Sequence, residues 1–300
     1  MNLKQIEIFV TVAELGSFSK AAQVLGTAQP TLSRQVRQLE VALHEHLFAR
    51  NGRGVELTEA GQRMLLHGRT ILQTVANARA DFGAHRQEPV GRATIGLPPS
   101  IARRITVPLI QRFKSHLPKA RLEVVEGLSS HMTGWLIDGQ MDMALLYNPQ
   151  PHLSLSITPL ARERLCLIGR QDSLPPGPVA FGDLPRYPLV MAQKGQIFRS
   201  LMEAQALLHG TPLNVAWEVA SLPVIFDLLK AGHGFAVLTE TALDSHQERG
   251  DSTLDARLIH TPEIPCTLCL AQRAHYRESL LIQRTKAELV ALVERVMGRA

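Results

Sequence analysis

Residues 17–53 constrain the fold of this chain more than any other stretch. They read SFSKAAQVLGTAQPTLSRQVRQLEVALHEHLFARNGR, in which two segments with apolar residues at helical intervals are separated by a short polar break. That periodicity predicts two helices joined by a tight turn. Gly26 can take the positive φ that ends the first of them, and Thr27 is the predicted N-cap of the second.

A further helix is predicted before this pair and ends near Gly16. Its predicted apolar face consists of Leu3, Ile6, Phe9, Val10 and Ala13. The helix that follows is capped by Ser17 or Ser19, and the residues expected to face inward are Ala21, Ala22, Val24 and Leu25.

The third helix is predicted to be amphipathic. Its buried row is Leu32, Val36, Leu39 and Leu43, and its opposite face is polar. An amide such as that of Gln29 can bond the edge of adenine, and the Arg34 guanidinium can bind guanine or a phosphate. The alternative for such a face is plain solvation. The residues predicted to contact DNA on this helix are Gln29, Pro30, Thr31, Ser33, Arg34 and Arg37.

A basic turn follows the third helix. Asn51-Gly52 is a dipeptide favoured in hairpins, and Arg50 and Arg53 flank it. Arginines at the tip of such a hairpin can bind phosphates or enter the minor groove. The turn before the third helix and the hairpin after it favour a DNA-binding surface over a merely solvated one.

These residues resemble the DNA-binding domain of LysR-type transcriptional regulators. The family pattern S-x-x-A-A-x-x-L-x-x-x-Q-P-x-x-S-x-x-I/V-x-x-L-E, followed by L-F-x-R and T-x-A-G, is specific. The matching residues here are Ser19, Ala21, Ala22, Leu25, Gln29, Pro30, Ser33, Val36, Leu39, Glu40, Leu47, Phe48, Arg50, Thr58, Ala60 and Gly61. The resemblance implies a winged helix-turn-helix over residues 1–58, with DNA contacts from Gln29, Pro30, Ser33, Arg34, Arg50 and Arg53.

A long helix is predicted over residues 59–87, capped by Thr58. Met64, Gly68, Ile71, Val75, Ala78 and Phe82 form a heptad seam along it. A helix cannot bury such a seam against itself, so a second copy of the chain is the expected partner; packing on its own domain is the alternative. The family resemblance makes residues 59–88 the linker helix of a homodimer or homotetramer.

Residues 91–300 follow a hinge at Pro89 and alternate short apolar strands with amphipathic helices. That alternation predicts parallel sheets with helical crossovers, an α/β class. The strand near 267–273 lies far along the chain from the strand near 93–97, which is expected if the chain passes twice between two lobes. The predicted lobes are about 91–161 with 267–300, and about 162–266. They resemble the periplasmic-binding-protein-like effector domain of the family.

Three predicted strand-to-helix junctions carry hydroxyl or aromatic side chains where α/β proteins bind ligands. Converged on one cleft, they would bind a small anion. For each serine alone, an ordinary N-cap is the competing interpretation. The candidate effector-binding residues are Ser100, Ser129, Ser130, His131, Ile197 and Phe198, at positions that correspond to the usual inducer site of the family.

Composition limits which other classes of protein this chain can belong to. The net charge is +5, and residues 1–90 carry 10 Lys and Arg against 8 Asp and Glu, so DNA binding depends on individual arginines. No apolar run approaches the roughly 18 residues of a membrane span, and the N-terminus is amphipathic, so a cytoplasmic protein without membrane partners is expected.

The three cysteines are too few for a disulfide framework; Cys266 and Cys269 are interpreted as structural strand residues. No catalytic grouping, metal site or cofactor motif is found.

The sequence thus predicts a DNA-binding transcriptional regulator, not an enzyme, that is switched by a small organic anion between two lobes. Its expected partners are double-stranded DNA, the effector and a second copy of itself, with RNA polymerase as a further candidate. Ligand-independent control, a cysteine redox switch, and a solute-binding or catalytic α/β protein are the alternatives. Within the family, LIDGQMDMALLY resembles most the nitrogen-assimilation-control and sulfur-utilisation branch, and to a smaller extent regulators of aromatic catabolism.

Overall fold

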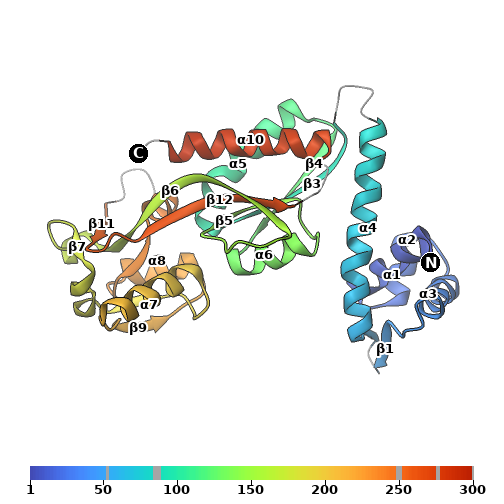
Figure 1. Cartoon of the computed structure of the whole chain (residues 1–300), viewed down its shortest axis with the longest axis horizontal. Helices are drawn as coiled ribbons and strands as arrows, with labels where there is room; N and C mark the ends of the chain where they lie inside the picture. Colours follow the sequence, from blue (N-terminus) through green and yellow to red (C-terminus); the bar gives the residue numbers. More distant parts are fainter. Residues whose placement is uncertain (52–53, 84–88, 248–251, 275–277, 299–300) are drawn as a thin grey trace. The chain divides into compact units, whose positions relative to one another are not determined.

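The computed structural model describes residues 1–51, 54–83, 89–247, 252–274 and 278–298. It divides the chain into two compact units (Figure 1). The first holds Met1–Gly91 with Asp138–Gln140, and the second holds Arg92–Ile137 with Met141–Ala300. Each unit is described by itself.

The first unit is a winged helix-turn-helix followed by a long helix, as predicted. Its helices are α1 (Leu3–Leu15), α2 (Phe18–Leu25), α3 (Gln29–Leu43) and α4 (Glu59–Gly83), and its hairpin pairs β1 (Phe48–Asn51) with β2 (Gly54–Leu57). The first three helices enclose one apolar core, which includes Ile6, Phe9, Ala21, Leu32, Val36 and Leu39. This core fixes the angle at which α3 presents its opposite face.

Most helix ends of the first unit lie where the sequence predicts them. Gly16 and Gly26 end α1 and α2 with φ of 60° and 58°, and the Ser17 hydroxyl accepts the Lys20 N–H at 3.4 Å. Thr27, however, does not cap α3: its hydroxyl donates to the Leu25 carbonyl at 3.1 Å, and Ala28 occupies the N-cap without a side-chain bond. The prediction of Thr27 as the cap was wrong because helix α3 begins one residue later.

Two residues predicted to face the core are exposed. Leu3 lies at the start of α1 and Val24 lies on the outer side of α2, with 44% and 68% of their surface exposed. Helix α2 has only eight residues and buries Ala21 alone, with Ala22 and Leu25 partly covered. The buried face of α1 is wider than predicted, since Ile8 and Val12 are also buried.

The two halves of the heptad seam of α4 have different surroundings. Thr58 caps the helix by accepting the Gly61 N–H at 3.0 Å. Met64 is buried in the core of its own unit, and a Cβ at Gly68 would lie 2.9 Å from Val10 Cγ2 and 3.2 Å from Ile6 Cγ2. The expectation that the whole seam faces a second copy was therefore wrong for its first half, which packs on α1. Ala78 is exposed further along, and the Phe82 side chain and residues 84–87 lie outside the described residues.

The second unit is a two-lobed α/β body. One lobe contains β3 (Gly91–Leu97), α5 (Pro99–His116), β4 (Ala120–Glu126), α6 (Ser129–Ile137), β5 (Met143–Tyr147) and α10 (Leu280–Met297). The other contains β7 (Val179–Ala180), β8 (Leu189–Met191), α7 (Ile197–His209), β9 (Val215–Glu218), α8 (Leu222–Lys230), β10 (Ala236–Thr239), α9 (Glu240–His246) and β11 (Leu254–His260), with 3-10 turns at Gln171–Ser173 and Phe181–Arg186.

Two long strands join the lobes, and Figure 1 shows them side by side beneath α10. Strand β6 (Leu155–Arg170) pairs antiparallel with β12 (Pro265–Arg273) from Leu155 to Arg164, and with β10 and β11 beyond that point. The sheet order is β4-β3-β5-β12-β6-β11-β7. The α/β class was predicted correctly, but the prediction of purely parallel sheets was wrong. Strand β3 pairs parallel with β5, and β8 with β9, whereas β6 and β12 run in opposite directions between the lobes and pair antiparallel. The predicted lobe limits at 161–162 and 266–267 fall inside these continuous strands.

Apolar packing on both faces of the sheet holds this unit together. All five residues of β5 are buried, which is typical of a strand covered by helices on both sides. Helices α5 and α10 lie together over the first lobe and contribute Ile105, Leu109, Leu289 and Leu292 to the largest cluster. Within the described ranges, no helix is long and apolar enough to cross a lipid bilayer.

Substituting Gly68→Val tests the contact between α4 and α1. The added side chain would overlap Val10 and Ile6 and should destabilise the unit by about 1–3 kcal/mol. Hydrogen exchange of the α1 amides in the full chain, followed by mass spectrometry, should accelerate about tenfold or more. The control is Ala76→Val at an exposed position of the same helix, for which only the helix propensity changes, by about 0.6 kcal/mol. Equal exchange in both variants would contradict the packing.

Candidate functional sites

The outer face of α3 presents the polar side chains that the sequence assigns to DNA. Gln29, Pro30, Thr31, Arg34 and Arg37 are exposed, and Ser33 is half-buried. Among the described residues, neither Arg34 nor Arg37 has a side-chain hydrogen bond or ion pair in the structure. The buried row Leu32, Val36 and Leu39 lies on the other side. Both guanidiniums are thus free to bind a ligand outside the unit.

The N-terminus of α3 is open. Its N-cap, Ala28, offers no acceptor, so the first N–H groups of the helix have no side-chain partner. Such a helix end attracts phosphate oxygens. The hairpin β1–β2 follows α3, but the Arg50 side chain and the whole of Arg53 lie outside the described residues.

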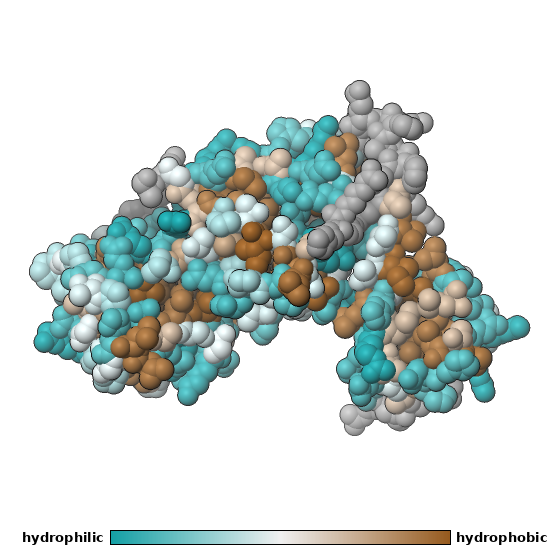
Figure 2. Space-filling view, in the orientation of Figure 1, coloured by the Kyte–Doolittle hydropathy of each residue, from teal (hydrophilic) through white to brown (hydrophobic). Residues whose placement is uncertain are grey.

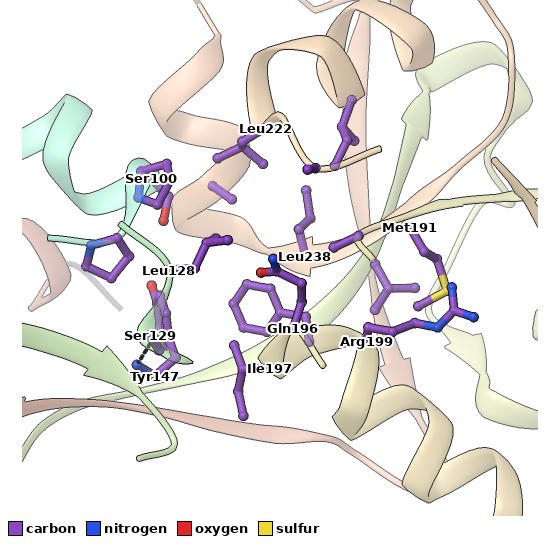
Figure 3. Close-up of a pocket in the computed structure, with 18 of the residues that line it drawn as sticks. Ser100, Leu128, Ser129, Tyr147, Met191, Gln196, Ile197, Arg199, Leu222 and Leu238 are labelled. Atoms are coloured by element: carbon purple, nitrogen blue, oxygen red, sulfur yellow. Dashed lines mark hydrogen bonds between the residues drawn. The ribbon is translucent and has the colours of Figure 1, made fainter. Parts of the chain in front are cut away.

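A cavity of about 100 Å³ lies between the two lobes of the second unit. It is formed where β3 meets α5, β4 meets α6 and β8 leads to α7, and by the first turn of α8 and the end of β10 (Figure 3). We call it the interlobe cavity. The α5–α9 contact, with the Arg104–Asp244 ion pair at 3.2 Å, also joins the two lobes.

One end of the interlobe cavity is polar. Ser100 is 95% buried by its neighbours, with 5% of its surface exposed, and bonds the Tyr147 side chain. The Ser129 hydroxyl accepts the Tyr147 N–H at 3.0 Å, which leaves its own proton available to a ligand. Tyr147 donates its hydroxyl to Glu163 Oε2 at 2.6 Å. Burial, followed by the adjacent Glu163 carboxylate, raises the pKa of Tyr147 well above its usual value, so this hydroxyl stays protonated.

The opposite end of the interlobe cavity is apolar. Leu128, Ile197, Phe198, Leu222 and Leu238 line it, and the Phe198 ring packs on Tyr147 with centroids 5.3 Å apart. Figure 3 shows the Gln196 amide extending toward the same space. The cavity thus combines a hydroxyl-bearing end with an apolar wall.

Arg199 is the basic residue of the interlobe cavity. With 6% of its side chain exposed, it places Nε 2.6 Å from Glu203 Oε1 and Nη2 3.6 Å from Glu218 Oε1. Its Nη1 has no partner within the described part of the chain. Figure 3 shows the guanidinium beside Met191, at the far side from Ser100 and Ser129. Arg199 therefore links α7 to β9 and forms ion pairs with two carboxylates.

Five of the six candidate effector-binding residues line the interlobe cavity: Ser100, Ser129, Ser130, Ile197 and Phe198. His131 does not; it is exposed on α6, with its ring 6.2 Å from that of Trp135. The sequence did not single out Tyr147, Gln196, Leu222 or Leu238 for this cavity. Tyr147 could have been found from its place at the end of the apolar strand β5, whereas the leucines look like ordinary core residues.

The three cysteines are free and buried. Cys166 and Cys266 belong to different apolar clusters, and Cys269 is 5% exposed. Burial, with help from the Glu240 carboxylate, raises the pKa of Cys166 to about 12, and burial together with Glu163 raises that of Cys266 further. Burial also raises the pKa of Cys269. Reactive thiols are deprotonated, so these three are poor nucleophiles.

Two family models cover most of the chain. Residues 3–62 match the bacterial regulatory helix-turn-helix protein model of the lysR family, and residues 86–293 match the LysR substrate binding domain. The chain belongs to the LysR family. It is a DNA-binding regulator of that family with an effector-binding domain.

Individual LysR proteins match over nearly the full length. The nitrogen assimilation regulatory protein nac of Klebsiella aerogenes is 32% identical over 98% of this chain and 96% of its own, and that of Escherichia coli is 30% identical over 98% and 95%. This agrees with the branch predicted from the sequence. The matched relatives are named as regulators, not enzymes.

Solved structures of the family share the fold. A full-length OxyR variant from Pseudomonas aeruginosa superposes with a TM-score of 0.78 at 23% identity, covering 98% of this chain and 95% of that one. CbnR in complex with its target DNA gives 0.70 at 21% identity, covering 99% and 100%.

The cysteine environment leads to a direct test. In the native LysR protein, none of the three thiols should react with Ellman's reagent within minutes at about pH 8, because each is buried and protonated at that pH. In concentrated urea, all three should react at once. The absorbance of the released thiolate measures both. One thiol reacting rapidly in the native state would contradict the buried assignment and revive a redox switch.

Proposed function

We propose that this LysR protein binds a specific DNA site through α3 and the β1–β2 wing, and that a small organic anion in the interlobe cavity controls this binding. Residues 1–58 would contact DNA, 59–88 would link two copies, and 91–300 would bind the effector. The observation that carries the proposal is the pairing of an exposed, unengaged basic helix face with a separate cavity of mixed polarity.

The α3 face has the chemistry for reading a major groove. Gln29 and Arg34 are exposed near the start of the helix, where bidentate contacts to adenine and guanine are made. The open N-terminus of α3 favours a phosphate beside it. One unit carries few positive charges, so two copies on one site would raise the affinity that a single copy lacks.

The interlobe cavity fits a ligand-controlled switch. It lies between lobes that β6 and β12 connect, so a ligand that contacts both lobes can favour one lobe arrangement over another. A cysteine redox switch is disfavoured by the raised thiol pKa values. Ligand-independent control would leave this cavity without a role.

Self-association is supported by exposed apolar surface on the second lobe. Figure 2 shows an apolar patch over the lobe that carries α7 and β9. Leu207, Leu208 and Trp217 are 86%, 75% and 55% exposed there. Exposed apolar groups of this size on one face favour a protein partner, and a second copy is the partner expected from the family.

Replacing Arg34→Ala tests the reading face. Repeated rounds in which the wild-type protein selects DNA duplexes of random sequence should yield a partly palindromic consensus site. The variant should lose preference at one position in each half-site and bind the consensus about 1–3 kcal/mol more weakly, measured by electrophoretic shift. Arg186→Ala removes an exposed charge, paired with Asp183, from the second lobe and should bind as the wild type does. Unchanged selectivity in Arg34→Ala would overturn the α3 assignment.

Filling the interlobe cavity tests the effector site. A thermal-shift screen of small carboxylates on the full chain should find some that raise Tm, because a ligand bound to the native state stabilises it. Leu128→Trp should abolish these shifts and the effect of the same carboxylates on DNA binding, with basal DNA binding retained. Leu153→Trp at a 96% exposed position is the control. Shifts that survive in Leu128→Trp would place the ligand elsewhere.

A further inference from the structure

Glu40 belongs to the LysR pattern but is not among the proposed DNA contacts, and its side chain bonds residues outside its own helix. It lies in the last turn of α3 and is half-buried. Its Oε1 accepts the N–H of Leu47 at 2.8 Å and that of Phe48 at 3.4 Å. Hydrogen bonds to a carboxylate are stronger than those between neutral groups. Helix α3 therefore holds the residues at which the wing begins (Figure 1).

The start of α4 holds the same residues from the other side. The Thr58 N–H donates to the Leu47 carbonyl at 3.0 Å, and the Thr58 hydroxyl donates to the His46 carbonyl at 2.6 Å. That hydroxyl also accepts the Gly61 N–H as the cap of α4. A Cβ at Gly61 would overlap the Leu47 carbonyl oxygen. A glycine at this position lets α4 begin close to the wing.

We call residues 46–48 the wing anchor. Two of its side chains are fixed as well: Leu47 is 1% exposed, and the Phe48 ring packs on Phe9 with centroids 5.3 Å apart. Two N–H groups of the wing anchor bond α3, and two of its carbonyls bond the first residue before α4. Turning α3 relative to α4 would break these hydrogen bonds.

Satisfying buried backbone groups is the simpler role for these bonds, because a buried N–H or C=O needs a partner. That role predicts a loss of stability when a partner is removed, and nothing more. The packing indicates a second role. Helices α3 and α4 both pack on α1, so apolar contacts couple them mainly through a third helix, whereas the wing anchor joins them by directional bonds.

We propose that Glu40 and Thr58, through the wing anchor, fix the angle between α3 and the linker helix α4, and thereby the spacing of half-sites that two copies accept on DNA. The inference rests on the proposed function, in which residues 59–88 link two copies on one site. Glu40 and Thr58 are positioning residues: they set where α3 lies, and α3 reads the bases.

The geometry of the duplex makes spacing sensitive to this angle. One added base pair displaces a half-site by about 3.4 Å along the duplex and turns it by about 35° around the axis. A rigid junction between α3 and α4 cannot follow that change without losing base contacts. A loosened junction can follow it, while the side chains that contact the bases stay the same.

Binding to sites of different spacing tests the coupling. The duplexes carry the consensus selected by the wild-type protein, with the spacer between half-sites kept or changed by one base pair. In an electrophoretic shift of the full chain, the wild type should bind the changed spacers at least about tenfold more weakly. For Glu40→Ala this penalty should fall to about threefold or less, with the same bases selected within each half-site. Glu40→Gln keeps an oxygen acceptor and should retain the penalty.

Thr58 allows the same test from the side of α4. Thr58→Val removes the hydroxyl that bonds His46 and Gly61 and should relax the spacing as well, whereas Thr58→Ser keeps both bonds and should behave as the wild type does. Glu45→Ala removes an exposed negative charge just after α3 and is the control for charge. It should retain the full spacing penalty. Hydrogen exchange of the α1 amides shows which variants are folded, and if only Glu40→Ala or Thr58→Val folds, that variant decides.

The outcomes separate this inference from the proposed function. A wild-type spacing penalty in folded Glu40→Ala and Thr58→Val would overturn the coupling and leave the bonds with a stabilising role alone. A wild-type protein that selects half-sites but accepts any spacing would also overturn it, with the DNA-reading role of α3 intact. If the wild type selects no consensus, the proposed DNA function itself fails.

Discussion

The antiparallel pairing of β6 with β12 is the constraint on which the ligand-binding unit depends. These strands run without a break from one lobe to the other, and their hydrogen bonds extend from Leu155 to Arg164 on β6. The same β6 then pairs with β10 and β11, so both lobes share one sheet. Because a paired strand resists bending sharply, the lobes are held at a short separation, and the cavity between them stays small enough for side chains of both lobes to touch one ligand.

Some helices of the chain begin with a side-chain cap, and others begin without one. Ser17 and Ser279 use their hydroxyls to satisfy N–H groups at the starts of α2 and α10, and Thr239 does the same for α9, which contributes Ala242 to the cavity. Where the proposed DNA surface and the cavity lie, the caps are Ala28, Pro98 and Gln196, which accept nothing through their side chains. Leaving such ends open costs some stability in the free protein, and an anion that binds there recovers it. Both proposed ligands of this protein, a phosphate backbone and a carboxylate, are anions.

The secondary structure was largely predictable because local patterns control it. The turn glycines Gly16 and Gly26, the cap Thr58, and the strands near 93–97 and 267–273 were predicted close to their observed limits. The errors arose where packing overrides local pattern. Val24 fits the helical stripe but points outward, because α2 is too short to bury more than Ala21. Gly68 was interpreted as a gap in a dimer seam, yet side chains of α1 pack against it.

By itself the sequence determined the family, the winged helix-turn-helix, the α/β class, and five residues that meet at one cavity, since motif spacing and periodicity carry that information. Only the tertiary structure decided which apolar residues form a cavity wall instead of core, because Leu222 and Leu238 look alike in sequence to any buried leucine. It also decided that the Arg199 guanidinium, which is within reach of Glu203 on the same helix, lies next to Glu218 of β9 as well. Charge pairing between residues on different elements depends on distances that only the folded chain sets.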